Sequence, residues 1–103
     1  MSEFEPKWKS EAADYLAAAL TALQTQDECL RLLDDLCTVS ELEALAQRLE
    51  VARLLTESQT YSQISEITGA STATISRVKR CLNYGPGGYR LVLDRLLNRG
   101  KQQ

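Results

Sequence analysis

Residues 60–83 read TYSQISEITGASTATISRVKRCLN. Thr60 followed by Gln63 forms a capping box, in which the two side chains satisfy free amides at the start of a helix. Gly69 is suited to end that helix because glycine adopts the left-handed conformation without a Cβ clash. Ser71 is suited to cap a second helix. The pattern predicts helices over about residues 61–67 and 72–83, joined by a short turn, and this arrangement is a helix-turn-helix.

The second of these helices has an apolar side and a polar side. Six positions of the motif are expected to point inward, namely Ile64, Ile67, Ala70, Ile75, Val78 and Leu82. Ala73, Ser76, Arg77 and Arg80 then lie on the opposite side of the second helix, flanked by Thr72, Thr74 and Lys79. A plain helical hairpin with a solvated face is the alternative, but it does not account for the small residues directly after the turn.

The rest of the chain is also predicted to be helical. No stretch alternates apolar and polar residues with β-branched enrichment, so strands are not expected. The other helices are predicted over about residues 7–23, 27–36, 40–56 and 89–97, with Asp27 capping the second of them and a Thr38–Glu41 capping box before the third. On that third helix Leu42, Leu45, Leu49, Ala52 and Leu55 are expected to face the core. A chain of 103 residues is short enough to form one domain, residues 1–103, of all-α class.

Several function classes are excluded by what the sequence lacks. It has no histidine, and its three cysteines, Cys29, Cys37 and Cys81, are far apart. We therefore expect no catalytic residues, no metal site and no resident cofactor, and the cysteines are interpreted as small packing residues. No apolar run is long enough to span a bilayer or to form a signal core. The protein is therefore predicted to be cytoplasmic, with no membrane partner and no enzymatic activity.

Charge is distributed unevenly along the chain, although the formal net charge is only −2. Residues 1–37 carry a net charge of −5 and residues 38–59 a net charge of −2, whereas residues 60–83 carry +2 and residues 84–103 carry +3. No acidic residue lies between Gly69 and Asp94. The basic half can therefore face a phosphate backbone while the acidic half faces away from it.

The helix-turn-helix has the chemistry that a DNA-binding helix needs. Small side chains at the start of the second helix let the backbone approach base edges in the major groove, and basic side chains farther along neutralise phosphates. Amides at both helix starts can hold phosphate oxygens. The predicted partner is double-stranded DNA, and the predicted contact residues are Tyr61, Ser62, Ser65, Ser71, Thr72, Ala73, Thr74, Ser76, Arg77, Lys79 and Arg80.

The first helix predicts a dimer. Trp8, Tyr15 and Leu20 share one apolar stripe, which the core of a single small domain can hardly cover. A homodimer is therefore expected. A helical protein–protein interaction module of the same fold, without specific DNA readout, stays open as the alternative function.

From about Thr38 to Leu97 the sequence resembles the Trp repressor superfamily, and in particular its Trp-repressor-like YerC/YecD group. The resemblance rests on LEALAQRL at 42–49, YSQIS at 61–65, GASTATISRV at 69–78, and the NYG and GY segments at 83–85 and 88–89. It implies an intertwined all-helical dimer and a sequence-specific transcriptional regulator, specifically a repressor, that binds palindromic operators.

The resemblance also implies a ligand pocket formed by Thr38, Arg48, Arg77, Val78 and Cys81. Two arginines can bind a flat ring by cation–π contact and an anion by forked hydrogen bonds. Two positions depart from the family pattern, because Val78 stands where a glycine is expected and Cys81 where a serine is expected. These departures argue against tryptophan as corepressor. The absence of any ligand and a different small-molecule corepressor of unknown identity both stay open.

Overall fold

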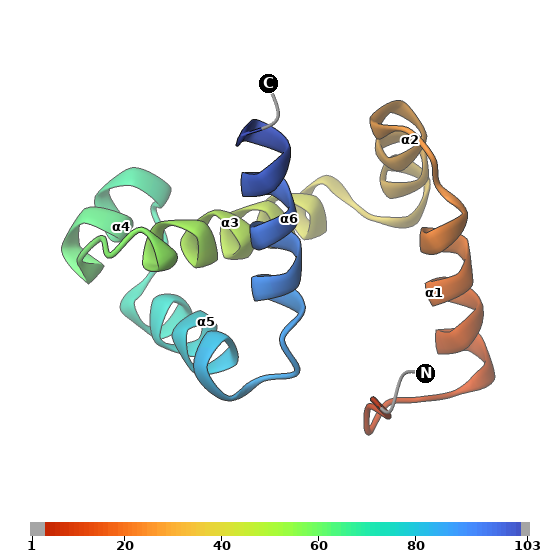
Figure 1. Cartoon of the computed structure of the whole chain (residues 1–103), viewed down its shortest axis with the longest axis horizontal. Helices are drawn as coiled ribbons and strands as arrows, with labels where there is room; N and C mark the ends of the chain where they lie inside the picture. Colours follow the sequence, from red (N-terminus) through yellow and green to blue (C-terminus); the bar gives the residue numbers. More distant parts are fainter. Residues whose placement is uncertain (1–3, 102–103) are drawn as a thin grey trace. The chain divides into compact units, whose positions relative to one another are not determined.

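The computed structural model describes residues 4–101, and this part of the chain contains helices and no strand. The all-α prediction is confirmed. The helices of these described residues are α1 Glu11–Ala22, α2 Gln26–Leu36, α3 Val39–Thr56, α4 Tyr61–Thr68, α5 Thr72–Tyr84 and α6 Gly88–Lys101 (Figure 1). None of the helices within residues 4–101 combines the length and apolarity that crossing a bilayer requires.

The chain forms two compact units, Met1–Leu42 and Glu43–Gln103, which we call the N-terminal unit and the C-terminal unit. Helices α1 and α2 and the start of α3 belong to the first, and the remainder of α3 with α4, α5 and α6 belongs to the second. The prediction of a single domain over residues 1–103 stays a prediction.

Helices α1 and α2 begin at hydroxyl caps that differ from the predicted starts. The Ser10 hydroxyl accepts a hydrogen bond from the Ala13 amide (3.0 Å), so α1 begins at Glu11, and the prediction of a helix from about residue 7 was wrong. Thr25 caps α2 by accepting from the Glu28 amide (3.1 Å). Asp27, the predicted cap, lies within the first turn and instead accepts a hydrogen bond from Arg31 Nε (2.7 Å). Hydroxyls compete well for this position because they reach the free N3 amide directly.

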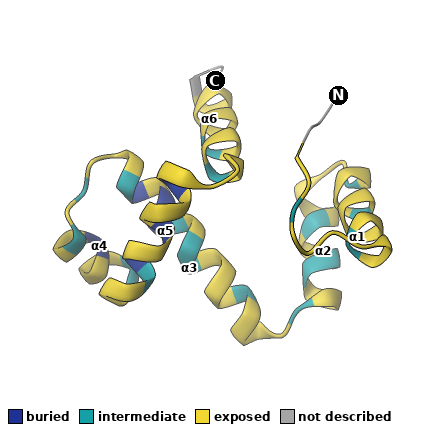
Figure 2. Cartoon of the chain, turned by 90° about the horizontal axis from the view of Figure 1, so that it is seen from below, coloured by how far each residue is buried: buried dark blue, intermediate teal, exposed yellow. Residues whose placement is uncertain are grey.

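The core of the C-terminal unit lies where α3, α4 and α5 meet, as the buried segments in Figure 2 show. Ile64, Ile75 and Val51 are completely buried, and burial of such a side chain stabilises the fold by about 1.5 to 3 kcal/mol. Tyr89 and Leu93 of α6 pack against this core. Its buried residues are Val51, Ala52, Leu54, Ile64, Ala70, Ile75, Val78 and Leu82.

Three residues that were expected in the core are exposed in the structure. Ile67, predicted to point inward, is 59% exposed, because the core side of the short helix α4 is taken by Ile64 and by the half-buried Thr68 one turn later. On α3 the buried residues are Val51, Ala52 and Leu54, whereas the predicted Leu45 and Leu49 are exposed. Apolar residues occur on every side of α3, so periodicity alone does not single out the side that this core uses.

Candidate nucleic-acid interface

The turn between α4 and α5 is built as the sequence predicted. Thr60 accepts from the Gln63 amide (3.1 Å), and the Gln63 side chain accepts from the Thr60 amide (2.8 Å), which completes the capping box of α4. Gly69 ends α4 with φ +75°, and Ser71 caps α5 by accepting from the Thr74 amide (3.2 Å). Local hydrogen bonds therefore determine where both helices of the motif begin.

Three further hydrogen bonds made by Thr68 hold this turn in place. The Thr68 hydroxyl accepts from the Ala70 amide (3.1 Å) and donates to the Ile64 carbonyl (2.7 Å). The Thr68 carbonyl accepts from Gln47 Nε2 of α3 (3.1 Å). Together with the buried Ala70, these bonds connect the turn to the helix beneath it.

The predicted contact residues on α5 lie mostly at the surface. Seven of them are exposed, whereas Thr74 is half-buried, and its hydroxyl accepts a hydrogen bond from the Ser71 hydroxyl (3.1 Å). On α4, Ser62 and Ser65 are exposed and Tyr61 is half-buried. The exposed α5 set is Ser71, which caps the helix, followed by Thr72, Ala73, Ser76, Arg77, Lys79 and Arg80.

The surface of α5 presents unpaired positive charge. Arg77 and Arg80 are exposed, and within residues 4–101 neither guanidinium forms an ion pair or a hydrogen bond. Side chains that make no internal pair do not have to break one in order to bind a phosphate oxygen. This arrangement fits the electrostatic requirement for binding a polyanion.

Lys79 is held by an interaction that the sequence did not reveal. Its ammonium group lies 5.6 Å from the centroid of the Tyr61 ring, within the range of a cation–π contact. The two residues are far apart in sequence and meet only because α4 and α5 pack together. Lys79 is thereby directed toward the start of α4.

The free amides at the two helix starts are fewer than predicted. The amides of Gln63 and Thr74 are already bonded to the capping hydroxyls of Thr60 and Ser71. The first two amides of each helix have no acceptor within their own helix. On α5 these are the amides of Thr72 and Ala73, next to the exposed Arg77 turn.

The five residues of the implied ligand pocket lie in different surroundings. Thr38, in the N-terminal unit, caps α3 through a reciprocal box with Glu41, and the bond from the Thr38 amide is the main reason that the pKa of Glu41 lies below its ordinary value. The other four belong to the C-terminal unit. Arg48 is half-buried, Arg77 and Cys81 are exposed, and Val78 is 1% exposed.

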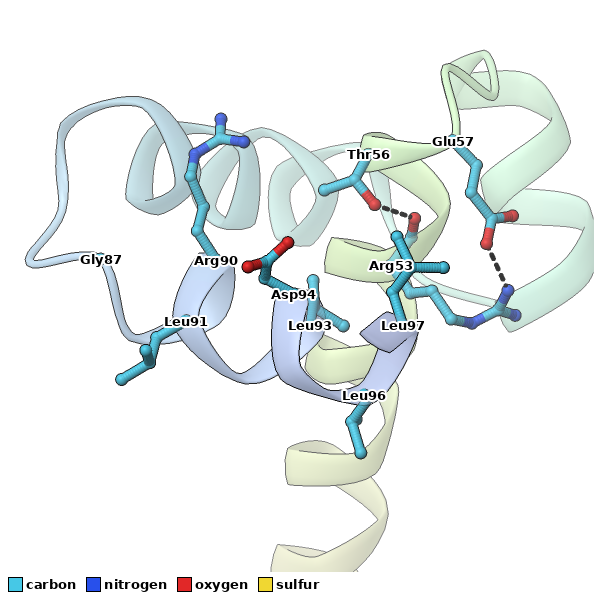
Figure 3. Close-up of a pocket in the computed structure, with 10 residues that line it drawn as sticks. All are labelled: Arg53, Thr56, Glu57, Gly87, Arg90, Leu91, Leu93, Asp94, Leu96 and Leu97. Atoms are coloured by element: carbon cyan, nitrogen blue, oxygen red, sulfur yellow. Dashed lines mark hydrogen bonds and ion pairs between the residues drawn. The ribbon is translucent and has the colours of Figure 1, made fainter. Parts of the chain in front are cut away.

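Two cavities in the C-terminal unit were not predicted. The larger, of about 850 Å³, lies between the last turns of α3 and one side of α6 (Figure 3). Leucine side chains of α6 line it together with Arg90, Asp94 and the charged end of α3. The smaller, of about 530 Å³, includes Leu49, Cys81 and Tyr89 in its lining. A pattern search along the sequence cannot find such cavities, since they arise where separate helices approach.

At the larger cavity, Arg53 is held by two glutamates. Its Nη2 lies 2.6 Å from Glu50 Oε2, and its Nη1 lies 2.9 Å from Glu57 Oε2. The hydrogen bonds with Arg53 hold the pKa of Glu50 below its ordinary value, and those with Glu50 and then Glu57 raise the pKa of Arg53. Because Arg53 and Glu57 are paired and leucine side chains of α6 line the cavity, this part of it suits apolar contacts.

No metal centre is formed by the described part of the chain, residues 4–101, in which no three histidine, cysteine, aspartate or glutamate side chains gather. The three cysteines are free thiols, with Cys29 and Cys37 half-buried and Cys81 exposed. Cys81 therefore differs from the expected packing role.

Comparison with known proteins gives one consistent result. The model of the family described as Trp repressor protein matches residues 11–97. The protein YerC of Bacillus subtilis (strain 168) is 54% identical over 90 residues, which covers 87% of this chain and 86% of YerC. The aligned region therefore includes both units.

Solved structures with the same fold come from two other bacteria. The crystal structure of a candidate Trp repressor from Staphylococcus aureus is 47% identical, with a TM-score of 0.83 over 87% of this chain and 90% of that one. A TrpR-like protein from Eubacterium eligens ATCC 27750 is 50% identical, with a TM-score of 0.83 over 87% of this chain and 93% of that one. With these similarities and the helix-turn-helix described above, the chain belongs to the Trp repressor family, whose members are DNA-binding regulators rather than enzymes.

Proposed function

We propose that the chain is a sequence-specific transcriptional repressor that binds double-stranded DNA as a homodimer, with α5 entering the major groove. The observation that carries the proposal is the outward side of α5. Small side chains, Ala73 and Ser76, are exposed beside the unpaired guanidinium groups of Arg77 and Arg80. A helix needs small residues where it meets base edges and cations where it meets phosphates, and α5 has both on one side.

The proposal of a homodimer is supported by the N-terminal unit. No residue of α1 or α2 is buried within the chain, and Trp8 and Tyr15 are 70% and 80% exposed. Exposed apolar area of this extent is typical of a surface that a partner covers. The acidic residues 1–37 and the basic residues 84–103 are complementary in charge, so we propose that the N-terminal unit of one protomer packs against α6 of the other.

The test begins with selection of duplexes from a random DNA pool by the full-length protein, followed by fluorescence anisotropy on the selected sequence. We expect a palindromic site, because a two-fold dimer places its recognition helices about 34 Å apart. The double variant R77A/R80A should bind about 30-fold more weakly, and its salt-dependence slope should fall by about 2, because two cations no longer neutralise phosphates.

The matched control is R31A, which removes an exposed arginine of α2 that forms an ion pair with Asp27. Its DNA affinity should stay within about twofold of the wild type, because exposed pairs contribute little. If the wild-type protein shows no preference among duplexes at about 150 mM salt, specific readout is wrong. If the R77A/R80A variant regulates transcription in the cell as the wild-type protein does, the protein-interaction alternative is favoured.

A further inference from the structure

The family suggests an indole corepressor, and the structure allows a direct test of whether this chain has room for one. Val78 is the residue that decides it. Its side chain is 1% exposed and belongs to the same core cluster as Ile75 and Leu82 of α5 and Val51 of α3. The surface of Val78 that a ring would have to contact is therefore already covered by protein atoms. The residues present do not fit tryptophan.

The side chain of Val78 cannot move aside easily. A β-branched residue in a helix has one strongly preferred χ1 rotamer, and neighbouring core side chains occupy the space around it. Cys81 lines the 530 Å³ cavity, whose lining does not include Arg48, Arg77 or Val78. A thiol is also a weaker hydrogen-bonding group than the serine hydroxyl expected at this position.

The two arginines are consistent with the same conclusion. Among residues 4–101, the guanidinium groups of Arg48 and Arg77 have no acidic partner. Arg77 lies on the exposed side of α5, one residue before Val78, so its charge points to solvent while the valine points to the core. Arg77 is therefore available to DNA without a ligand between them.

A corepressor acts only if it binds the DNA-competent form of the protein better than the other form. A ligand that fills a gap beneath the recognition helix can gain this difference in affinity, because it binds only the form in which the helix is held in place. At Val78 no gap is left for a ring, because the valine side chain, 1% exposed, is itself packed among the core residues. We infer that Val78 holds α5 against α3 and α4 in place of an indole ligand, so that DNA binding by this protein is independent of tryptophan. The part of this inference that concerns DNA rests on the function proposed above.

The first experiment is calorimetric titration of the full-length wild-type protein with L-tryptophan up to about 1 mM, the weak end of specific binding. We expect no saturable heat, and hydrogen exchange of the α5 amides should be the same with and without tryptophan. Saturable binding of one tryptophan per chain, or slower exchange in α5 on its addition, would overturn the inference. Neither readout requires DNA binding.

The second experiment compares V78A with V51A, which removes the same two methyl groups from an equally buried position on α3. In V78A, hydrogen exchange should become faster in both helices. The rate increase should be on the order of tenfold larger for the α5 amides than for the α3 amides, because the methyl groups removed belong to α5. An equal increase in exchange rate in α3 and α5 would contradict the role given to Val78. A larger increase in α5 than in α3 in the V51A variant would contradict it as well.

DNA affinity supplies the third readout. On a selected duplex, the dissociation constant should change by less than about twofold when about 1 mM L-tryptophan is added. Tightening by about tenfold or more would overturn the inference and leave the proposed DNA binding intact. If no duplex is selected at all, the proposed function fails, and the calorimetry and exchange measurements still decide whether Val78 closes the site.

Discussion

Gly69 is the residue on which the geometry of the α4–α5 turn depends most. Its φ of +75° lies in the left-handed region, which costs any residue with a Cβ about 1 to 2 kcal/mol. A Cβ placed at this position would meet nothing within 4 Å. The requirement for glycine is therefore conformational rather than steric, and it determines how α5 leaves α4.

Replacing this glycine gives a prediction at the scale of one residue. G69A should lower the free energy of unfolding by about 1 to 2 kcal/mol, because alanine has to adopt the left-handed conformation. Urea denaturation followed by circular dichroism measures the change. The control is G88A at the start of α6, where φ is not positive and a Cβ has open space. Its stability should change by less than about 1 kcal/mol, and equal losses in the two variants would show that φ is not the cause.

At the scale of the helix, hydroxyl caps decide where α1, α2, α4 and α5 begin. Each cap satisfies an amide that has no partner within the helix, and this stabilises the helix by about 1 kcal/mol. The cap of α5 has a second consequence, because Ser71 also bonds the Thr74 hydroxyl (3.1 Å) beside the proposed DNA-contacting turn. Order at this helix start is thus coupled to the proposed function.

Comparison of two caps tests that coupling. S71A and S10A each remove a serine that accepts from the third helical amide, in α5 and α1 respectively. Both should lower the free energy of unfolding by about 1 kcal/mol. Only S71A should also weaken DNA binding, by about threefold or more, since it frays the turn that carries Thr72 and Ala73. A loss of DNA affinity in S10A as large as in S71A would mean that affinity follows stability alone.

At the scale of the whole molecule, the exposed apolar residues are the basis of the proposed homodimer. Helix α6 exposes apolar side chains, as α1 and α2 do. Leu91, Leu96 and Leu97 are each about half exposed or more. These three side chains also line the 850 Å³ cavity (Figure 3). We propose that the unburied helices α1 and α2 of one protomer pack against the leucine-lined cavity of its partner, a contact that a two-fold dimer would make twice.

The oligomeric prediction follows from those surfaces. Sedimentation equilibrium at micromolar concentration should give twice the chain mass of 11.5 kDa, and the thermal midpoint should rise with protein concentration. L20K on α1 should shift the equilibrium toward monomer. The control A18K adds the same charge about 200° around the helix from Leu20 and should leave the dimer intact. A monomeric wild type, or equal effects of both variants, would contradict this interface.

Local chemistry let the sequence alone determine the helices of the motif. The boundaries of α4 and α5 follow from Thr60, Gly69 and Ser71, because capping bonds and a left-handed glycine involve residues only a few positions apart. The outward placement of Arg77 and Arg80 follows in the same way from helical periodicity. The family resemblance could be identified for a similar reason, since its motifs are short runs of consecutive residues in α3, in the helix-turn-helix and at the start of α6.

Tertiary packing decided everything that depends on residues distant in the sequence. The choice of Val51 and Leu54 over Leu45 and Leu49 as core residues, and the contact of Lys79 with Tyr61, arise only when separate helices meet. Val78 shows the difference most clearly. Its departure from glycine was visible in the sequence, but its complete burial depended on the packing of α5 against α3 and α4, because a side chain is covered only by the neighbours that the fold brings to it.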